Sequence, residues 1–591
     1  MKPKLLLLIQ LFFACSTFAQ RIEITGKVLE ENGAALPGVN ILEKGTFNGT
    51  VSDLNGNYTI NVSDKNAVLT FSFVGYLTQE IPVDDKTTVD VVLKPDIALM
   101  EEVVVIGYGT IKKKDLTGAV VVVNTDDFKN VQSLSIGDAI QGMASGVTIR
   151  SNGDIGSEPN IKIRGIGNIS NNNPLYVVDG FIFTGGLRDL NINDIESIQI
   201  LKDASAAAIY GNRAANGVII ITTKRGKYGP TKIDFATKIG FEKLPSLNLM
   251  DTTEFFYYND MAYDNAGRPH QNHFENNTNW EKEALQVGIS SDYNLGISGG
   301  NETSNYLVSV NYFNNTGTLK GTNLDRYSIR VNTEAKKGAF IFGENMAISN
   351  AAVVPYSGGN PITDIMRMTP DIPVYNPDNP GGFGYGDEAR ARTFGTNPIA
   401  IQNLVNIKSE NTRLRGNLFT EAHIFKFLTY KITAGYETSF DAYKRLRKVG
   451  NFTLNLPYEP SHVYENKARY QSLLLDNLLT FNKSLGKHNV NAVLGSSYQH
   501  ESYDQISGLN HDIFVSGGHY LDVLNAGSSN PIVGGFRAEI YRISYFGRLQ
   551  YDFDGKYLLS ATLRRDATSQ FGPKYRVGYF PSVSAGWRIS D

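Results

Sequence analysis

The stretch Tyr541-Arg-Ile-Ser-Tyr-Phe-Gly-Arg-Leu-Gln-Tyr-Asp-Phe553 decides the fold class. Its odd-numbered positions are apolar or aromatic apart from Gly547, and its even-numbered positions are polar apart from Phe546. This alternation predicts a β-strand with one apolar and one polar face. The ten steps from Tyr541 to Tyr551 span about 33 Å at roughly 3.3 Å per residue. With a tilt of about 40°, that length matches the roughly 25 Å height of a lipid-facing band between aromatic girdles.

The same alternation recurs from Tyr557 to Leu563, and about fourteen such strands are expected in residues 231–591. Tight turns such as Phe553-Asp-Gly555 are opposed by long polar loops, which include 351–400 and 506–535. The pattern favours a mainly β chain ending in an antiparallel transmembrane β-barrel. A soluble sandwich also alternates, so a secreted soluble β-rich binding protein stays open as an alternative.

The composition agrees with a β-rich chain. Among 591 residues, 56 are Lys or Arg and 59 are Asp or Glu, so the formal net charge is −3. Such a balance argues against nucleic-acid binding by bulk charge. Charged residues make up only 19%, while Gly, Tyr and Phe number 57, 31 and 31. After the N-terminal segment no run of 18 apolar residues occurs, so no membrane-spanning helix is expected.

The first residues predict a secretory signal peptide over 1–19. Positive charges precede the apolar run Leu5–Ala14, and the small residues Thr17 and Ala19 fit a cut after Ala19. An N-terminal membrane anchor is the alternative, but the apolar run is too short to span. Cys15 is the only cysteine, so a chain cut after Ala19 has neither a disulfide nor a thiolate metal site.

Residues 20–95 show six or seven short alternating strands between turn signals, which predicts a small β-sandwich. One hairpin turn is expected at Asn55-Gly56. The surrounding Asp53-Leu-Asn-Gly56 partly matches a calcium-binding loop, but it lacks the glutamate that an EF-hand needs at position 12, so a turn is expected.

Residues 96–115 form a linker with a strand-like segment. The segment is Glu101-Glu102-Val103-Val104-Val105-Ile106-Gly107. An extended apolar segment between glycines can pair with a sheet edge of another protein. An ordinary strand of a neighbouring domain is the other interpretation of the same residues.

Residues 116–227 mix helix and strand signals and predict a compact α/β domain. One helix is expected over 133–143. A second is expected over 204–210, with Asp203 as its N-cap and Gly211 as its C-cap. A buried strand is expected over 217–224.

Each segment that partly matches a catalytic or metal-binding motif is incomplete or lies in the wrong structural context. Gly296-Ile-Ser-Gly-Gly300 matches a nucleophile elbow by letter but ends an alternating strand. His270-x-x-His273 lies in a polar stretch and is expected to be a solvated loop. Asp189-x-Asn191-x-Asn193 has calcium-like spacing, but the positions that need Gly and Glu are occupied by other residues, so a turn is expected.

Three segments of residues 173–224 carry a family resemblance. Asn173-Pro-Leu-Tyr-Val-Val-Asp-Gly180, Leu201-Lys-Asp-Ala-Ser-Ala-Ala-Ala-Ile-Tyr-Gly211 and the following Arg213–Lys224 resemble the plug signature of the SusC/RagA group of TonB-dependent outer-membrane receptors. The residues that the resemblance assigns to this signature are Arg164, Gly165, Asp179, Gly180, Lys202, Asp203, Tyr210, Gly211, Arg213, Asn216 and Gly217.

The resemblance implies a domain organisation and a function. Residues 20–95 resemble the carboxypeptidase-regulatory-like domain of this group, 101–107 resemble its TonB box, and 580–589 resemble a barrel strand. The implied protein is no enzyme and has no cofactor. It sits in outer-membrane lipid with a periplasmic N-terminal domain and binds TonB, which an inner-membrane complex energises. It imports oligosaccharide or peptide with a SusD-like surface lipoprotein and binds no nucleic acid.

A siderophore or cobalamin receptor is the alternative within the same architecture. The barrels of the group resemble the 22-stranded plugged class, and about fourteen strands are expected here. The chain is therefore interpreted as the N-terminal portion of a longer receptor or as a truncated gene product. The cargo itself is not readable from the sequence.

Contact residues are expected in two places. Arg164 and Arg213 are plug cations that either pair with carboxylates on the barrel wall or are ordinary surface arginines. A helix is expected near residues 363–368 in the loop 351–400. The loop aromatics that could contact cargo are Tyr356, Tyr375, Phe383, Tyr385 and Tyr520.

Overall fold

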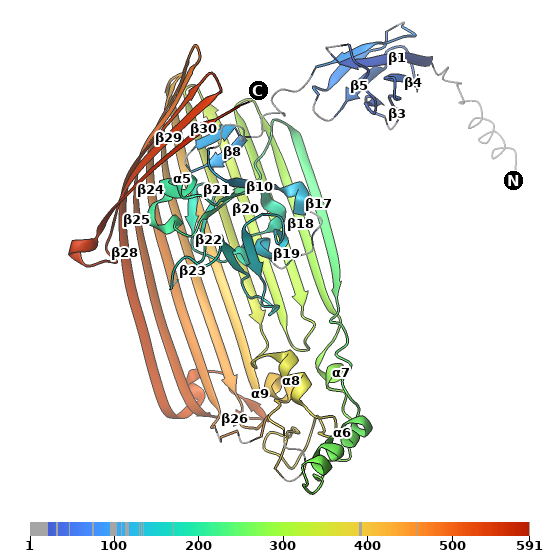
Figure 1. The fold of residues 1–591 in the computed structure, drawn as a ribbon, viewed down its shortest axis with the longest axis vertical. Helices are drawn as coiled ribbons and strands as arrows, with labels where there is room; N and C mark the ends of the chain where they lie inside the picture. Colours follow the sequence, from blue (N-terminus) through green and yellow to red (C-terminus); the bar gives the residue numbers. More distant parts are fainter. Residues whose placement is uncertain are drawn as a thin grey trace, which may run out of the picture. The chain divides into compact units, whose positions relative to one another are not determined.

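A computed structural model describes residues 22–589 apart from 31–32, 47, 74–75, 85, 95–102, 108, 113–116, 129–130, 132, 134, 170, 389, 391–392, 455 and 458. The predicted signal peptide and Glu101 and Glu102 lie outside the described residues. The chain divides into two compact units, residues 1–104 with 112–114, and residues 105–111 with 115–591 (Figure 1). Each unit is described by itself.

The first unit is the small β-domain expected from the turn signals. Its strands are β1 (Ile22–Glu30), β2 (Asn40–Glu43), β3 (Gly49–Val51), β4 (Asn57–Val62), β5 (Val68–Ser72), β6 (Gln79–Pro82) and β7 (Val91–Leu93). They form sheets in the orders β4-β1-β7 and β3-β2-β5-β6. Alternate side chains from both sheets share one apolar cluster that includes Ile24, Ile41 and Phe71. At the expected turn, Asp53 Oδ1 accepts hydrogen bonds from the backbone N–H groups of Asn55 and Asn57. The turn does not close the expected hairpin, because β3 and β4 belong to different sheets.

Residues 117–224 of the second unit form the α/β domain. Its strands are β10 (Val120–Asn124), β11 (Val147–Arg150), β12 (Asn160–Ile163), β13 (Leu175–Val178), β14 (Phe181–Phe183), β15 (Ile195–Leu201) and β16 (Val218–Thr223). Its helices are α3 (Thr125–Phe128), α4 (Ile136–Ala139) and α5 (Ala204–Ala207), with 3₁₀ turns η2 (Leu187–Asp189), η3 (Ile192–Asp194) and η4 (Ala208–Ala214).

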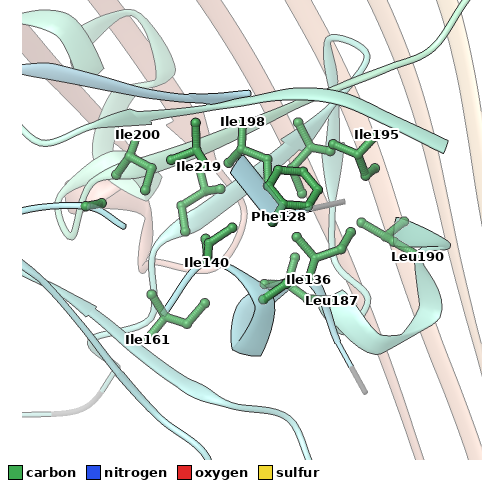
Figure 2. Packing of buried hydrophobic residues seen from close by; sticks show 14 of the residues in the cluster. Phe128, Ile136, Ile140, Ile161, Leu187, Leu190, Ile195, Ile198, Ile200 and Ile219 are labelled. Atoms are coloured by element: carbon green, nitrogen blue, oxygen red, sulfur yellow. The ribbon is translucent and has the colours of Figure 1, made fainter. Parts of the chain in front are cut away.

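The core of this domain lies on one face of the five-stranded sheet β10-β15-β16-β13-β14. Figure 2 shows isoleucines of β15 and β16 packed against Phe128 and the short helix α4. The helix expected over 133–143 is shorter, because α4 ends at Ala139 and turns follow it. Ser135 caps α4 by accepting a hydrogen bond from Asp138 N–H.

The rest of the second unit is one antiparallel sheet of twelve strands, which is the barrel-type sheet predicted from the alternation. Its strands, in order, are β17 (Gly229–Glu242), β18 (Gly288–Asn301), β19 (Ser304–Thr316), β20 (Asn323–Lys337), β21 (Phe340–Val354), β22 (Val405–Phe425), β23 (Leu428–Arg447), β24 (His462–Leu485), β25 (His488–Ile513), β28 (Gly527–Phe553), β29 (Tyr557–Thr568) and β30 (Val577–Trp587). Two short strands, β26 (Val515–Ser516) and β27 (His519–Tyr520), form a separate hairpin. Among the described residues the sheet thus has twelve strands, two fewer than the roughly fourteen expected, since β26 and β27 are a short hairpin in the connection between β25 and β28.

The two faces of the sheet differ as the sequence predicts. In β28, Tyr541, Ile543 and Tyr545 are exposed, whereas Ser544 and Phe546 are buried. Phe546 packs with Leu478 of β24 and Val493 of β25 against the α/β domain. Side chains of this parity therefore point to the α/β domain, and those of the opposite parity form the outward face.

The two ends of the sheet also differ. At one end, turns of two or three residues join the strands, as at 302–303 and 486–487. At the other end the connections are long, and they carry α6 (Thr252–Asn265), α7 (Trp280–Ala284), α8 (Pro361–Arg367) and α9 (Pro398–Leu404). Helix α8 confirms the helix expected near 363–368. Among the described helices, none is both long and apolar enough to cross a membrane.

Candidate functional site

The α/β domain lies against the inner face of the twelve-stranded sheet, and this sheet is called the wall from here on. Ile209 and Tyr210 of η4 and Val218 of β16 share an apolar cluster with Leu478 and Phe546 of the wall. Around this contact, the wall presents buried arginines, asparagines and carboxylates to the domain. Because burial of a charge is costly without a partner, the pairing of these groups determines how firmly the domain is held.

The hairpin between β13 and β14 places the first of these partners. Asp179 and Gly180 form its two-residue turn, with φ of 51° and 82°. Asp-Gly suits such a turn because both central residues need positive φ. The turn directs the Asp179 carboxylate to Thr223 of β16, whose N–H and Oγ donate to it at 2.9 and 2.8 Å.

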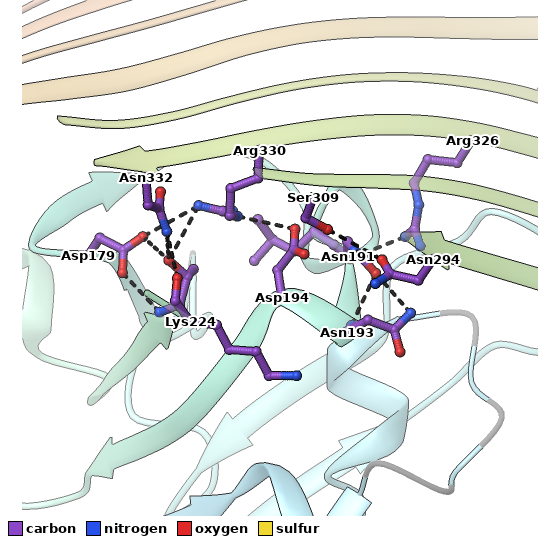
Figure 3. A network of polar contacts seen from close by, with 12 residues as sticks. Asp179, Asn191, Asn193, Asp194, Lys224, Asn294, Ser309, Arg326, Arg330 and Asn332 are labelled. Carbon is purple, nitrogen blue, oxygen red and sulfur yellow. Dashed lines mark hydrogen bonds and ion pairs between the residues drawn. The ribbon is translucent and has the colours of Figure 1, made fainter. Parts of the chain in front are cut away.

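Arg330 of β20 joins two carboxylates of the α/β domain (Figure 3). Its Nε lies 3.2 Å from Asp194 Oδ2, and its Nη1 lies 3.5 Å from Asp179 Oδ2. All three side chains are about 95% buried, with exposed fractions of 4%, 6% and 4% for Arg330, Asp194 and Asp179. Neighbouring Asn332 donates to the carbonyl of Lys224 at 2.7 Å. Strand β20 therefore contacts the α/β domain at Asp179 after β13, at Asp194 before β15 and at Lys224 after β16.

The turns η2 and η3 supply a second group of contacts. Asn191 donates to Asn294 of β18 at 2.9 Å, and Asn193 donates to Asp292 of the same strand at 2.9 Å. Arg326 of β20 donates to the carbonyl of Leu190 at 3.2 Å. The residues with calcium-like spacing therefore form turns, as expected, and their side chains contact the wall.

Asp189 meets a third arginine. Arg413 of β22 lies 3.1 Å from Asp189 Oδ2 and 2.6 Å from Glu437 Oε1 of β23. Thr184 of the α/β domain donates to the same Glu437 at 3.2 Å. Two wall strands and the α/β domain therefore share one buried ion network.

Gly211 marks a close approach between the domain and the wall. It has φ +70° and ψ −151°, a conformation that glycine alone adopts readily. A Cβ at this position would lie 1.9 Å from Asp566 Oδ2 and 2.7 Å from Arg564 Nε of β29. Arg564 in turn donates to the carbonyl of Ile209. The helix expected over 204–210 is shorter, because α5 ends at Ala207, and the glycine expected as its C-cap lies at a kink inside η4, where it makes room for two wall side chains.

The two plug cations, for which wall pairing and a surface position were both left open, have different partners. Arg213 lies 3.5 Å from Glu501 and donates to Gln499 of β25 at 2.9 Å, which is the first of these alternatives. Burial lowers the pKa of the Arg213 guanidinium, and the neighbouring Glu501 opposes that effect. Arg164 instead pairs at 2.5 Å with Asp203, inside the α/β domain, and its side chain is 53% exposed, which is closer to the second alternative.

The remaining signature residues organise the domain itself. Lys202 donates to the carbonyl of Ser145 at 3.0 Å, and Asp203 accepts from the N–H of Ala119. Asn216 donates to the carbonyl of Asn171 at 2.7 Å, in a loop held by asparagine side chains. Gly217 has φ +86° and lies against Ile163. Gly165, at φ +93°, faces open space.

The strand-like linker segment forms a hairpin. Strand β8 (Val103–Ile106) pairs with β9 (Gly109–Lys112). A Cβ on Gly107 would lie 2.5 Å from Ile209, and one on Gly109 would lie 3.0 Å from Arg548 of β28. Arg548 is five residues from the short-turn end of β28, so the hairpin turn lies near that end.

At the long-loop end, a cleft of about 310 Å³ separates the α/β domain from the loops. Asn152 and Asp154 of the α/β domain lie on one side, and Tyr356 and Asn360 lie beside α8 on another. Tyr356 donates to Asp364 at 3.0 Å, and burial raises the pKa of both groups. The volume is at the lower end of small-ligand sites. A molecule here would touch the α/β domain and the loops at once.

The other loop aromatics lie elsewhere. Tyr375 is 64% exposed and pairs with Phe383, whose ring is buried near Ala400 and Leu404. Tyr385 is half-buried. The Tyr520 hydroxyl accepts from Val449 N–H at 3.2 Å beneath the β26–β27 hairpin. Of the five expected contact residues, only Tyr356 lines this cleft.

The paired histidines brace the long loop that carries α6. His270 lies 2.8 Å from Asp264, which raises the His270 pKa through their hydrogen bond. His273 stacks on Phe256 with ring centroids 4.0 Å apart and lies 3.6 Å from the buried Asp371. Within the described ranges, no group of three His, Cys, Asp or Glu side chains is arranged to hold a metal ion.

Comparison with known families agrees with this geometry. Residues 24–105 match the CarboxypepD_reg-like domain, and residues 112–218 match the TonB-dependent Receptor Plug Domain. The second match covers nearly all of the α/β domain, which is called the plug domain from here on.

Three further comparisons extend beyond these two domains. TonB-dependent receptor P3 of Formosa agariphila is 33% identical over 590 residues, which is 97% of this chain and 57% of the relative. TonB-dependent receptor SusC of Bacteroides thetaiotaomicron is 29% identical over 100% of this chain and 61% of the relative. The RagAB peptide importer in its open-open state aligns with a TM-score of 0.70 at 25% identity, over 82% of this chain and 58% of that chain. The chain thus spans less than two thirds of these relatives.

Proposed function

We propose a function from the premise that this chain is a TonB-dependent receptor chain of the SusC/RagA type, located in the outer membrane. Such a chain belongs to non-enzymatic transport proteins. The function is the import of oligosaccharide or peptide fragments, driven through TonB and assisted by a SusD-like surface lipoprotein. The observation that carries it is a folded plug domain held against the inner face of barrel strands by buried ion networks.

The two ends of the sheet give the transport a direction. Barrels of bacterial outer membranes have short periplasmic turns and longer extracellular loops. On that basis the cleft at Tyr356 faces outward and the β8–β9 hairpin faces the periplasm. Cargo in the cleft would touch the plug domain at Asn152 and Asp154, so its binding can bias the plug domain directly.

Energy must come from outside the outer membrane, and β8 is suited to receive it. An extended segment can add to a sheet edge, with main-chain hydrogen bonds providing the affinity. Force applied at 101–107 would reach the plug domain at once, because Gly107 lies against Ile209. Ile209 lies two residues before Gly211, where the plug domain approaches Asp566 and Arg564 of the wall closely.

Peptide and oligosaccharide are the two candidate classes of cargo. One related structure is named a peptide importer, and the cleft offers amide, carboxylate and hydroxyl groups that suit either class. Uptake of labelled peptide and glycan mixtures by cells with and without the neighbouring lipoprotein gene separates these classes.

Deletion of 101–107 tests the energy step. We expect the full-length receptor to reach the outer membrane in normal amounts and to bind cargo, whereas uptake is lost. Undiminished uptake would refute the assignment of this segment as the TonB-binding strand. Deletion of residues 571–574, which are exposed in the connection between β29 and β30 and do not line the cleft, is the control and is expected to leave energised uptake measurable.

A further inference from the structure

The inner face of β20–β23 carries its polar residues in rows that the strand register defines. One row consists of Ser328, Ser349, Arg413 and Ser439. The next row toward the short-turn end consists of Arg330, Ala347, Arg415 and Glu437. Both rows face the plug domain, because Arg413 and Arg330 pair with its carboxylates. Two arginines of β22 thus face the plug domain in adjacent rows, and Asp189 is paired with the first of them.

Arg415 is buried, and no carboxylate in the described part of the chain forms an ion pair with it. It is 8% exposed, and its guanidinium lies 4.8 Å from the centre of the Phe183 ring. Its Nη1 has no hydrogen-bond partner among the described residues. Glu437 lies opposite Arg415 in the register, but Arg413 and Thr184 already occupy its two oxygens at 2.6 and 3.2 Å. A buried cation without a carboxylate is costly, and such costs are retained mainly at functional positions.

Asp189 has a complementary unpaired oxygen. Its Oδ2 lies 3.1 Å from Arg413, whereas its Oδ1 is buried and makes no hydrogen bond to any residue that the structure describes. Arg188 Nε lies 3.8 Å from this Oδ1, beyond hydrogen-bond distance. Asp189 and Arg415 line the same cavity of about 10 Å³, together with the small residue Ala347. A carboxylate and a cation therefore border one small space without forming an ion pair.

Arg415 lies on the periplasmic side of Arg413. Strand β22 begins at Val405 beside the long loops and ends at Phe425 beside a short turn, and short turns of such barrels face the periplasm. The two residues from one row to the next span about 7 Å at roughly 3.4 Å each. Because barrel strands tilt by roughly 35–45°, a pull from the periplasm has a component along them. A slide of one row in that direction would bring Asp189 from Arg413 to Arg415.

Two other plug contacts would also meet polar wall side chains after the same slide. The two transfers are Asp194 from Arg330 to Asn332 in β20 and Asn193 from Asp292 to Asn294 in β18. In each strand the second partner lies two residues closer to the short-turn end. Polar groups that exchange one partner for another avoid the cost of a buried unpaired group. The slid position is therefore a plausible second arrangement of the interface on electrostatic grounds.

We infer that Arg415 is the second docking position of Asp189, reached when the energised plug domain moves by one row toward the periplasm. The inference rests on the TonB-driven import proposed above. After the transfer, Arg413 keeps Glu437 and Arg415 gains Asp189, so each buried cation has a carboxylate. Arg415 is a positioning residue, because it acts on the plug domain and not on cargo. Two discrete sets of partners give the movement a defined first stop.

Arg415→Gln in the full-length receptor tests this assignment. Because Arg415 has no ion pair before the movement, we expect the urea midpoint of plug unfolding in the purified receptor to be unchanged or raised. We expect cells to take up the labelled peptide or glycan mixtures about tenfold more slowly, because Asp189 would be buried without a cation after the slide. Arg415→Lys keeps the charge and should restore most of the uptake.

Arg413→Gln is the matched control on the same strand. It removes the present partner of Asp189 and Glu437, so it should lower the urea midpoint. In a receptor that already carries Asp189→Asn, Arg415→Gln should cause no further loss of uptake.

Three results would overturn the inference. They are equal uptake by Arg415→Gln and the unmodified receptor, a lowered urea midpoint of Arg415→Gln, and a further loss of uptake when Arg415→Gln is added to Asp189→Asn. Failure of the unmodified receptor to import either mixture is a different result, because it would overturn the proposed function and this inference with it.

Discussion

Arg330 of β20 and Asp194 of the plug domain form a buried ion pair with Nε 3.2 Å from Oδ2. The two residues are 136 positions apart in the chain. The same guanidinium reaches Asp179 at 3.5 Å. One wall side chain therefore fixes two separate turns of the plug domain, and the pairing is sheltered from solvent and salt.

Replacement of Arg330 by Ala is expected to loosen the plug domain strongly. It removes the guanidinium that contacts both buried carboxylates, Asp179 and Asp194, and loss of one partner of a buried pair costs about 3–5 kcal/mol. The measurement is the free energy of unfolding of the plug domain in urea. Arg225→Ala is the control, because Arg225 and Glu334 form a half-exposed pair worth about 0–1 kcal/mol. Equal effects of both substitutions would contradict the account.

Replacement of Gly211 by Ala is expected to displace the plug domain from β29. The new Cβ would clash with Asp566 and Arg564, in addition to the strain of φ +70°. Gly165→Ala carries the strain of φ +93° without a neighbour within 4 Å, so it isolates the backbone cost of about 1 kcal/mol. We expect Gly211→Ala to raise passage of large antibiotics into cells, whereas Gly165→Ala should not. Normal exclusion of these antibiotics by Gly211→Ala would exclude the close contact as a determinant of sealing.

Tyr356→Ala is expected to weaken cargo binding about tenfold, because it removes an aromatic face from the cleft, a loss of about 1.4 kcal/mol. Tyr356→Phe retains the ring and loses only the hydroxyl that donates to Asp364, so it should retain most of the affinity. Tyr375→Ala is the control, because Tyr375 is exposed away from the cleft residues. Calorimetry with the identified cargo measures all three. A larger effect of Tyr375→Ala would place cargo elsewhere.

The His270–Asp264 contact predicts a pH dependence of the α6 loop. The hydrogen bond that His270 donates to Asp264 raises the His270 pKa above its ordinary value of 6.5. The imidazolium is therefore favoured in the folded state, so the contact stabilises the loop fully below pH 6.5 and is lost as pH rises through the raised pKa. Titration of ¹⁵N-labelled histidine by NMR gives the pKa, with His270→Gln for assignment. Asp264→Asn should lower it, and an unchanged titration would disprove the contact.

The local chemistry of the chain made much of the fold predictable. The two-residue alternation in β28 identified the outward and inward faces. The plug signature could be located because its residues are contiguous. By contrast, α6 was missed, because none of its side chains is buried and its sequence lacks an apolar stripe.

The partners across the plug–wall interface could not be predicted. Asp189, Asn191 and Asn193 suggested only a turn, since their partners Arg413, Asn294 and Asp292 lie about a hundred or more residues away. Arg164 and Arg213 have the same charge, yet one pairs within the plug domain and the other with β25. Only the three-dimensional arrangement decides which cation reaches the wall.

A disulfide between the plug domain and the wall tests most directly whether the plug domain must move. Thr117 and Ser584 of β30 have hydroxyl oxygens 2.8 Å apart, so the two side chains point toward each other across the interface and are chosen for the cross-link. Cys15 is the only native cysteine, within the predicted signal peptide. We predict that the receptor with Thr117→Cys and Ser584→Cys binds cargo but does not import it when oxidised, and that reduction restores uptake. Equal uptake by the oxidised and reduced forms would contradict the account.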